Sequence, residues 1–256
     1  DAGTDAAGVK TTAVKKDGKY ILNGQKTFIS TAGHNENYII VAITGTNVVN
    51  GKERKEYSTF IVNKDAPGFS ISKPYHKMGM RGFVTADLFL DDVEVSEEDM
   101  LGAQGDGLNV ALGCLDSGRI SIATQALGIA QGAIDETINY VNQRKQFNKT
   151  IASFQNTQFK LAELQSKVDA SRLMIWRAAM LKDQGAKYSK EAAMAKYYCS
   201  DVANEVVRTC LQLFGGYGYI DEFPIERMYR DAKITEIYEG TSEAQKMVIA
   251  KAIGLK

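Results

Sequence analysis

The sequence predicts an α+β protein, in which an antiparallel β-barrel or sandwich is followed by a C-terminal helical bundle, on three observations. Residues 1–100 contain several β-rich segments with no intervening helical pattern. Residues 108–223 contain no proline, and their apolar residues recur at intervals of three and four. The pattern changes near Gly105-Asp106-Gly107. We therefore expect two domains, a β domain over residues 1–105 and a helical domain over residues 106–256.

The β domain is predicted from alternating apolar residues and turn signals. Residues 18–30 place Asn23-Gly24 between two alternating runs, which predicts a hairpin turn because glycine accepts the positive φ of a tight turn. Residues 37–44, 57–64 and 85–95 are rich in β-branched and aromatic side chains and are predicted to be strands. Successive strands without intervening helices favour an antiparallel barrel or sandwich.

The helical domain is predicted from apolar faces with helical spacing. Helices are expected at about 107–142, 155–183 and 189–213, with shorter ones near 224–236 and 242–253. Two faces have the spacing of a helix: Leu161, Leu164, Val168, Ile175 and Ala179; then Ala192, Ala195, Val202, Val206 and Cys210. Long helices with short links are typical of a bundle.

Composition excludes several classes of function. The 256 residues contain 31 basic and 31 acidic side chains without a basic block, so we expect no nucleic-acid partner. No apolar run approaches the ~20 residues of a membrane helix. Cys114, Cys199 and Cys210 lie in apolar helical sequence and are predicted to be buried thiols in a reducing compartment. Two histidines are too few for a histidine-rich metal site, and we expect no metal.

The first residues, DAGTDAAG, contain no initiator Met, signal region or transit pattern. We expect that the chain is a fragment with sequence missing upstream.

Two glycine-rich or cationic stretches each allow two interpretations. LFGGYGY, residues 213–219, has three glycines in four positions, which fits either a wide loop after a helix or a bare backbone that a ligand approaches closely. RKQFNK, residues 144–149, either neutralises the carbonyl end of a helix or binds phosphate oxygens.

Two polar stretches are similarly open. QKTFISTAG, residues 25–33, ends a strand in hydroxyl groups and glycine, which either cap the strand or bind a polar heterocycle. In DSGR, Asp116 and Arg119 are three residues apart, and a helical salt bridge is the simpler interpretation.

Glu239 lies between Tyr238 and Gly240, where one helix is expected to end and another to begin. A carboxylate beside aromatic surface is desolvated, so its pKa rises toward that of a general base. The alternative is a solvated loop residue. Thr241 or Ser242 is expected to cap the following helix, and Ser242 with Gln245 fits a capping box.

Five stretches occur in the order that they take in the acyl-CoA dehydrogenases: AGTDAAG, NGQKTFIS, RKQFNK, FGGYGY and RDAKITEIYEGTSEAQ. The chain resembles that family over all 256 residues and is most similar to its short-chain, butyryl-CoA-type members. It lacks the N-terminal helical domain that such proteins carry.

The resemblance implies FAD and the conversion of a short straight-chain acyl-CoA to a trans-2-enoyl-CoA. Glu239 matches the base that removes the α-proton, while the β-hydrogen leaves as hydride to flavin N5. In some relatives the base lies instead on the helix that carries DSGR, and the matching residue here is Gly118, which cannot act as a base. This favours Glu239 and a straight-chain substrate.

The resemblance also assigns ligand contacts by position. Flavin contacts fall on Thr4, Phe28, Ile29, Ser30, Thr241, Ser242 and Glu243, although many relatives have Gln or Asn in the last segment. Contacts with the FAD of a neighbouring subunit fall on Arg144, Phe147, Gln155, Gln212, Gly215 and Gly216. Substrate contacts fall on Asp116, Arg119, Tyr238 and Gly240.

The resemblance further implies a homotetramer built as a dimer of dimers and electron transfer flavoprotein as redox partner. The expected compartment is the bacterial cytoplasm, or the mitochondrial matrix in a eukaryote. The alternatives are an enoyl-CoA reductase or an acyl-CoA oxidase of the same fold, or an inactive fragment or scaffold.

Overall fold

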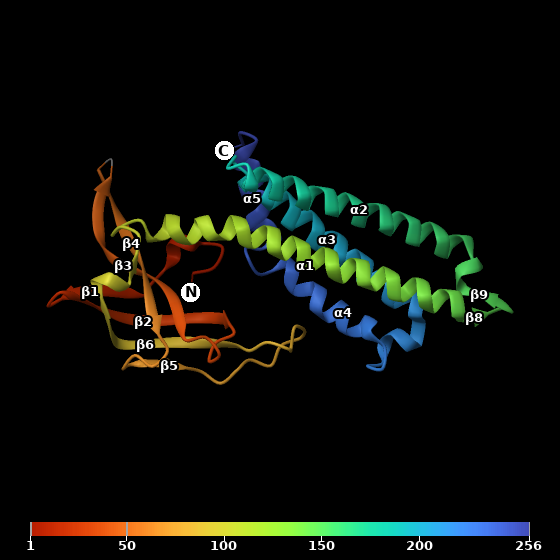
Figure 1. Cartoon of the computed structure of the whole chain (residues 1–256), viewed down its shortest axis with the longest axis horizontal. Helices are drawn as coiled ribbons and strands as arrows, with labels where there is room; N and C mark the ends of the chain where they lie inside the picture. Colours follow the sequence, from red (N-terminus) through yellow and green to blue (C-terminus); the bar gives the residue numbers. More distant parts are fainter. Residues whose placement is uncertain (1, 50, 256) are drawn as a thin grey trace. The chain divides into compact units, whose positions relative to one another are not determined.

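The computed structural model describes residues 2–49 and 51–255 and divides the chain into two compact units (Figure 1). The β unit comprises Asp1–Lys77 and Arg81–Cys114, and the helical unit comprises Met78–Met80 and Leu115–Lys256. The predicted class, a β domain followed by a helical bundle, is confirmed.

The β unit is a seven-stranded sheet curled into a half-barrel, with the order β5-β6-β2-β1-β3-β4-β7. Its strands are β1 Thr12–Lys16, β2 Lys19–Ser30, β3 Asn37–Val49, β4 Lys52–Asn63, β5 Phe69–Ile71, β6 Thr85–Ser96 and β7 Met100–Leu101. All neighbouring strands are antiparallel except β1 and β3, which are parallel and pair Thr12 with Ile43. The sheet is therefore mixed, because the chain reverses twice before β3 returns beside β1.

The predicted hairpin turn at Asn23-Gly24 is wrong, since β2 continues through both residues. The turn lies at Asp17-Gly18, where both residues have positive φ, 51° and 78°, and Lys16 pairs with Lys19. Asp-Gly is a turn signal of equal strength. Gly24 instead lies at a shift of register between β2 and β6.

We expect Gly24→Ala to destabilise the β unit. A Cβ at Gly24 approaches the Thr11 Cα to 2.8 Å, and the Gly24 φ is 147°, which disfavours a side chain. The expected loss in free energy of unfolding is about 1–3 kcal/mol, measured by chemical denaturation. Gly113→Ala is the matched control, because its Cβ meets nothing within 4 Å in a helix that favours alanine. Equal stability of the two variants contradicts the prediction.

The helical unit packs its long helices around one apolar core. Its helices are α1 Gly107–Gln143, which begins in the β unit, α2 Gln155–Asp183, α3 Ser189–Phe214, α4 Pro224–Ala232 and α5 Ser242–Ala252. In Figure 1, α1, α2 and α3 run side by side. The predicted helix near 224–236 ends at Ala232 and tightens into the 3₁₀-helix η5, Lys233–Glu236.

The segment Met78–Met80 packs with the helical unit. Arg230 Nη1 donates to the Met78 carbonyl at 3.0 Å, and the Asp231 carboxylate accepts a hydrogen bond from the Met80 N–H. A Cβ at Gly79 approaches the Arg230 carbonyl carbon to 2.6 Å, so this close approach requires glycine.

The cysteines are only partly as predicted. Cys199 and Cys210 are buried in α3, and burial raises the pKa of their thiols to about 12 and about 11. Cys114 is exposed, so the prediction that all three are buried is wrong. Apolar neighbours in sequence do not decide which face of a helix a residue occupies.

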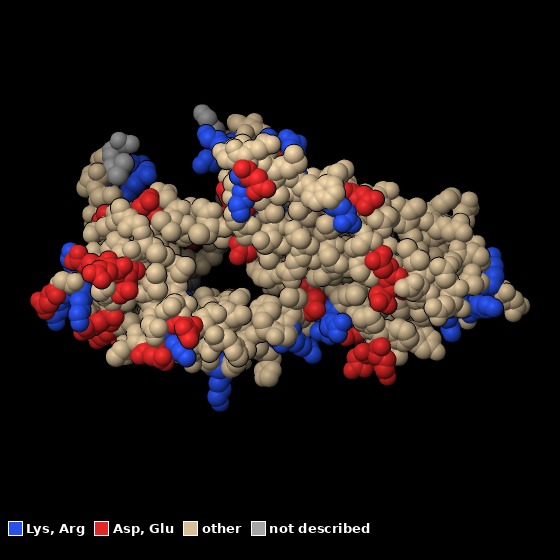
Figure 2. All heavy atoms as spheres, viewed as in Figure 1, with Lys and Arg blue, Asp and Glu red and all other residues tan. Residues whose placement is uncertain are grey.

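On the face shown in Figure 2, the described residues form no large patch of only positive or only negative charge. Figure 2 shows Lys and Arg interspersed with Asp and Glu over the visible face. Among residues 2–49 and 51–255, every helix is too short or too polar to cross a bilayer. No group of three metal-ligating side chains occurs within the same residues.

Candidate active site

The Glu239 loop joins η5 to α5 through two residues with left-handed backbone. Glu239 has φ 55° and Gly240 has φ 88°. This conformation is rare for a residue with a Cβ. Thr241 is the N-cap of α5, and its hydroxyl accepts a hydrogen bond from the Ala244 N–H at 3.3 Å. The predicted capping box of Ser242 with Gln245 is therefore wrong, because the Gln245 side chain turns back beneath the loop.

Two fully buried side chains bind the carbonyl groups of this loop. Lys196 Nζ, from α3, donates to the Gly240 carbonyl at 2.6 Å. Gln245 Nε2 donates to the carbonyls of Glu239 and Gly240 at 3.0 and 2.9 Å. Within the described residues, the Glu239 N–H has no acceptor. Side chains of α3 and α5 thus hold the carbonyls of the loop, and the Glu239 N–H remains available to a ligand.

The Glu239 side chain is half-buried against α1. A Cβ at Gly118 approaches the Glu239 Cδ to 2.9 Å, so the absence of a side chain at Gly118 leaves room for the carboxylate. Burial raises the pKa of Glu239 above its ordinary value, while the charges of Arg119 and Lys196 act in the opposite direction. A carboxyl whose pKa is raised by burial despite two nearby cations is a candidate functional group.

The predicted pair of Asp116 and Arg119 is present, with Nη1 and Oδ1 2.6 Å apart. Ser189 also donates to the Asp116 carboxylate. Arg119 is only 8% exposed, and its Nε lacks a hydrogen-bond acceptor among the described residues. Arg119 is therefore buried while Asp116 is partly exposed, and the contact of the pair with a CoA moiety stays a prediction.

The residues on either side of Glu239 and Gly240 differ in how far they are exposed to solvent. The Tyr238 hydroxyl donates to Gln125 of α1, and burial raises the pKa of Tyr238. Ser242 begins α5 and is partly exposed. Glu243 is exposed, and hydrogen bonds with its own backbone and with the Thr241 hydroxyl lower its pKa.

The strand end predicted to contact flavin lies in the β unit. Phe28 has φ 59° and is 69% exposed, Ile29 packs on the sheet core, and Ser30 is exposed. The Phe28 N–H donates to the buried Asp87 at 3.3 Å, and Asp87 also accepts from the Tyr75 hydroxyl at 2.9 Å.

Thr4 is exposed in the loop before the short helix Ala6–Gly8. Its contact with flavin stays a prediction.

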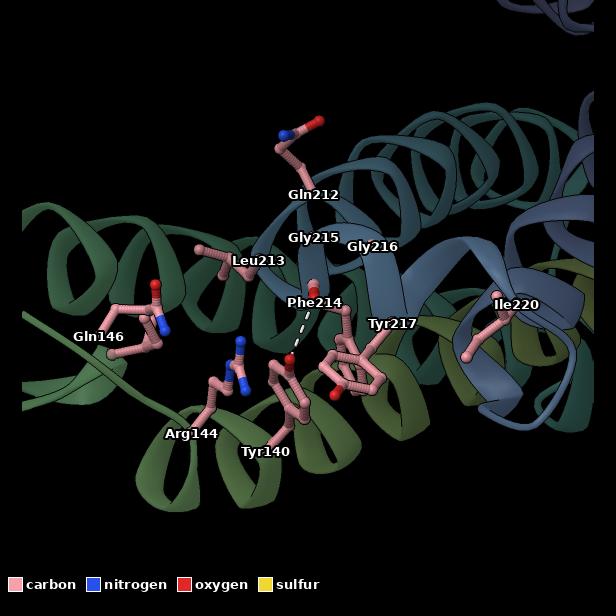
Figure 3. A pocket seen from close by; sticks show the side chains of 11 residues that line it. Tyr140, Arg144, Gln146, Gln212, Leu213, Phe214, Gly215, Gly216, Tyr217 and Ile220 are labelled. Atoms are coloured by element: carbon pink, nitrogen blue, oxygen red, sulfur yellow. Dashed lines mark hydrogen bonds between the residues drawn. The ribbon is translucent and has the colours of Figure 1, made fainter.

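A second candidate site is a cavity of about 460 Å³ in the helical unit (Figure 3). Arg144, Gln212, Gly215 and Gly216 line it, so four of the six residues predicted to reach a neighbouring subunit's FAD lie together. Gly215 ends α3 with φ 61°, and a Cβ on either glycine meets nothing within 4 Å. The backbone is therefore bare at the wall of the cavity.

The two remaining residues of that prediction lie outside the lining. Phe147 is 87% exposed at the turn between β8 Lys145–Gln146 and β9 Lys149–Thr150, and it meets Phe154 edge to face. Gln155 is exposed at the start of α2.

Aromatic residues complete the wall and were missed in the sequence. The Tyr140 hydroxyl donates to the Phe214 carbonyl at 3.1 Å, and the two rings stack at 4.1 Å. The Arg144 guanidinium lies 5.2 Å from the centre of the Tyr217 ring. In the sequence, Tyr217 belongs to the glycine-rich stretch 213–219, and Tyr140 gives no signal beyond helical spacing.

Lys196 and Gln245 were also missed as parts of a site. A signal existed for Lys196, because it is a lone cation on the apolar face of a predicted helix. Lysine is seldom fully buried without a specific partner.

The chain belongs to the acyl-CoA dehydrogenase family. Residues 1–93 match the model of the acyl-CoA dehydrogenase middle domain, and residues 105–254 match that of the C-terminal domain. Members of the family are flavoproteins.

Individual relatives carry different names. A 3-(aryl)acrylate reductase of Clostridium sporogenes is 49% identical over 97% of this chain and 65% of its own length. The caffeyl-CoA reductase-Etf complex subunit CarC of Acetobacterium woodii is 45% identical over 97% of this chain and 65% of its own length. The solved butyryl-CoA dehydrogenase of Megasphaera elsdenii has a TM-score of 0.94 and 43% identity over 98% of this chain and 65% of its own. The chain thus spans about 65% of the length of these relatives.

Proposed function

We propose that the protein containing this chain is an FAD-dependent acyl-CoA dehydrogenase. Its reaction is the α,β-dehydrogenation of a short straight-chain acyl-CoA to a trans-2-enoyl-CoA. The observation that carries the proposal is the Glu239 carboxyl, half-buried against Gly118 with a raised pKa, on a loop whose backbone is tied down. The similarity to butyryl-CoA dehydrogenase supports a short acyl chain.

In the proposed reaction, Glu239 accepts the α-proton of the thioester at a carboxylate oxygen. Its raised pKa brings the carboxyl closer to neutrality, where proton transfer is most effective. As the proton leaves, negative charge grows on the thioester oxygen, and the free Glu239 N–H is a donor for it. One preorganised donor is worth about 3–4 kcal/mol in the transition state. FAD, when bound, supplies the acceptor for the hydride of the β-carbon.

The residues of the cavity fit part of FAD. A guanidinium is well shaped for phosphate oxygens, and an exposed tyrosine ring offers a flat surface to an adenine. Arg144 and Tyr217 provide these groups, and the bare backbone at Gly215 and Gly216 permits close approach. At the other predicted contact, Phe28 and Ser30 place a ring and a hydroxyl at an exposed strand end.

Arg144→Gln is expected to weaken FAD retention without unfolding the protein. A hydrogen bond with a charged group contributes about 1.5–3 kcal/mol, which corresponds to an increase in Kd of roughly 10–100-fold. The measurement is fluorescence titration of the apoprotein with FAD. Arg208→Gln is the control, because Arg208 is an exposed α3 residue outside this lining. Equal FAD affinity in the two variants contradicts a role for Arg144.

The test of the function is the absorbance spectrum of the purified full-length protein. A flavin spectrum that bleaches anaerobically on addition of butyryl-CoA is the expected result. Bound flavin that butyryl-CoA leaves oxidised overturns the proposed substrate class. A colourless protein that gains no flavin on incubation with FAD favours a scaffold.

The reverse reaction, enoyl-CoA reduction, is the second candidate, because two of the relatives are named as reductases. The same base then returns the proton to the α-carbon, as microscopic reversibility requires. Reduced enzyme mixed with crotonyl-CoA or an arylacryloyl-CoA distinguishes the candidates by the rate of flavin reoxidation. Release of peroxide in air instead identifies an oxidase.

We further propose electron transfer flavoprotein as the redox partner, supported by the name of the Etf complex subunit. We also propose a homotetramer, in which the cavity of one subunit meets the FAD of another. The cytoplasm of a bacterium, or the mitochondrial matrix of a eukaryote, is the expected compartment. Sedimentation of the full-length holoenzyme tests the assembly.

A further inference from the structure

The Glu239 loop would be unfavourable without bonds from outside it. A left-handed backbone crowds the Cβ of Glu239 against its own carbonyl. The loop carbonyls point toward α3 and α5, where Lys196 and Gln245 bind them. Both side chains are 0% exposed. A buried ammonium is unfavourable unless it is well paired. The placement of Lys196 under this loop therefore suggests that its bond to the loop has a function.

We propose that Lys196 and Gln245 are positioning residues for the dehydrogenation: by binding the carbonyls of Glu239 and Gly240 they fix the direction of the Glu239 carboxylate and of its free N–H. The inference rests on the proposed role of Glu239 as base and deepens it. Neither side chain contacts the reacting atoms in this role.

The geometry explains how two carbonyl bonds orient a carboxylate. The Glu239 carbonyl lies in one planar peptide unit with the Cα atoms of Glu239 and Gly240. Holding this carbonyl and the next one, that of Gly240, therefore holds the Glu239 Cα, from which the carboxylate extends. Gln245 bridges both carbonyls, and Lys196 adds a second donor to one of them. The Gln245 amide lies so close that a Cβ at Gly240 meets its Nε2 at 2.6 Å. Lys196 and Gln245 together form a clamp on the two loop carbonyls, and the position of the Gln245 amide favours glycine at residue 240.

The charges around the clamp favour an ionised base. Lys196 faces Glu236 of η5, Arg119 of α1, Glu239 itself and Glu243 of α5. Glu239 faces Arg119 and Lys196. Burial lowers the pKa of Lys196 to about 8, while the charge of Glu236 acts in the opposite direction. Lys196 thus acts on Glu239 by charge as well as by position, whereas the neutral Gln245 acts by position alone.

The experiment uses the FAD-loaded full-length protein with three variants: Lys196→Met, Gln245→Met and the control Lys246→Met. Lys246 is an exposed lysine of α5 whose Nζ lies over the Tyr197 ring, 4.7 Å from its centre. The rate of flavin reduction by butyryl-CoA is measured in single turnovers across pH. Hydrogen–deuterium exchange of residues 236–245, without substrate, reports the loop directly.

The expected results separate the two residues. Both clamp variants lose about 10–100-fold in rate at saturating substrate, because a small misplacement of a base is costly, while the apparent Kd changes about threefold or less. In Lys196→Met the acid limb of the rate profile moves to higher pH, because a cation that lowers the pKa of Glu239 is gone. In Gln245→Met it does not move. Exchange in residues 236–245 quickens in both and stays unchanged in Lys246→Met.

Other outcomes overturn the proposal. A Lys196→Met enzyme with unchanged rate, pH profile and exchange refutes the clamp, provided that Glu239→Gln has lost flavin reduction. If Glu239→Gln still reduces flavin at the wild-type rate, the proposed base itself is wrong. Should Lys196→Met fail to fold, the rate and exchange of Gln245→Met decide, and wild-type values there refute the proposal.

Discussion

Glu239→Gln is expected to abolish flavin reduction by butyryl-CoA while leaving FAD bound. Gln has nearly the shape of Glu but cannot accept the α-proton, and a positioned base contributes about 10²–10⁴-fold to the rate. Burial raises the pKa of Glu239, so ionised Glu239 lowers stability above the pKa of an unfolded Glu. Gln at 239 removes that cost at neutral pH, and the free energy of unfolding is not expected to fall.

The wild-type pH profile tests the same carboxyl. The base acts only when ionised, so flavin reduction decreases as pH falls through the pKa of Glu239, which burial raises above its ordinary value. Glu222→Gln is the control, since Glu222 is an exposed carboxyl of the same unit and lies outside the Glu239 loop. Bleaching of the Glu239→Gln protein at the wild-type rate excludes Glu239 as the base.

Gly118→Ala is expected to lower the rate of flavin reduction by about 10²-fold, since a displacement near 1 Å has this cost. The new Cβ lies 2.9 Å from the Glu239 Cδ, and the end of a flexible side chain moves more easily than a helix. The carboxylate is therefore displaced while the fold is kept. Alanine also favours the helix, so the free energy of unfolding changes by about 1 kcal/mol or less.

The control for this variant is Gly128→Ala, in the same helix, where a Cβ meets nothing within 4 Å. Its rate of flavin reduction is expected to match wild type. If Gly118→Ala also matches wild type, the carboxylate does not need the space that Gly118 leaves. Comparing these two alanines separates displacement of the base from a general effect of stiffening α1.

Local patterns were sufficient for the class of fold and for most elements. The proline-free region with apolar spacing predicted α2 at 155–183, which begins and ends where expected. Glycine after residue 213 predicted the end of α3, and Gly215 is its C-cap. The hairpin at Asn23-Gly24 failed because Asp17-Gly18 carries an equal turn signal, and only pairing with β6 and contact with Thr11 decide between them.

The candidate site was predicted only in part. Glu239 was selected from its immediate neighbours, and its half-burial agrees with the pKa argued from them. The exposure of Cys114 was not predicted, because apolar neighbours in sequence do not show which face of a helix a residue occupies. The burial of Arg119 was not predicted either, because spacing along a helix reveals a pair but not its depth.

The sequence by itself determined that a β domain precedes a helical one, the long helices and the family, because each depends on residues a few positions apart or on an ordered set of motifs. Only the tertiary structure decided that β3 lies parallel to β1, that Gly118 makes room for Glu239, and that Lys196 lies beneath Gly240. These are contacts between residues far apart in the chain. Their energies come from burial and from pairing of buried charge, which depend on distance in space and leave no periodic trace in sequence.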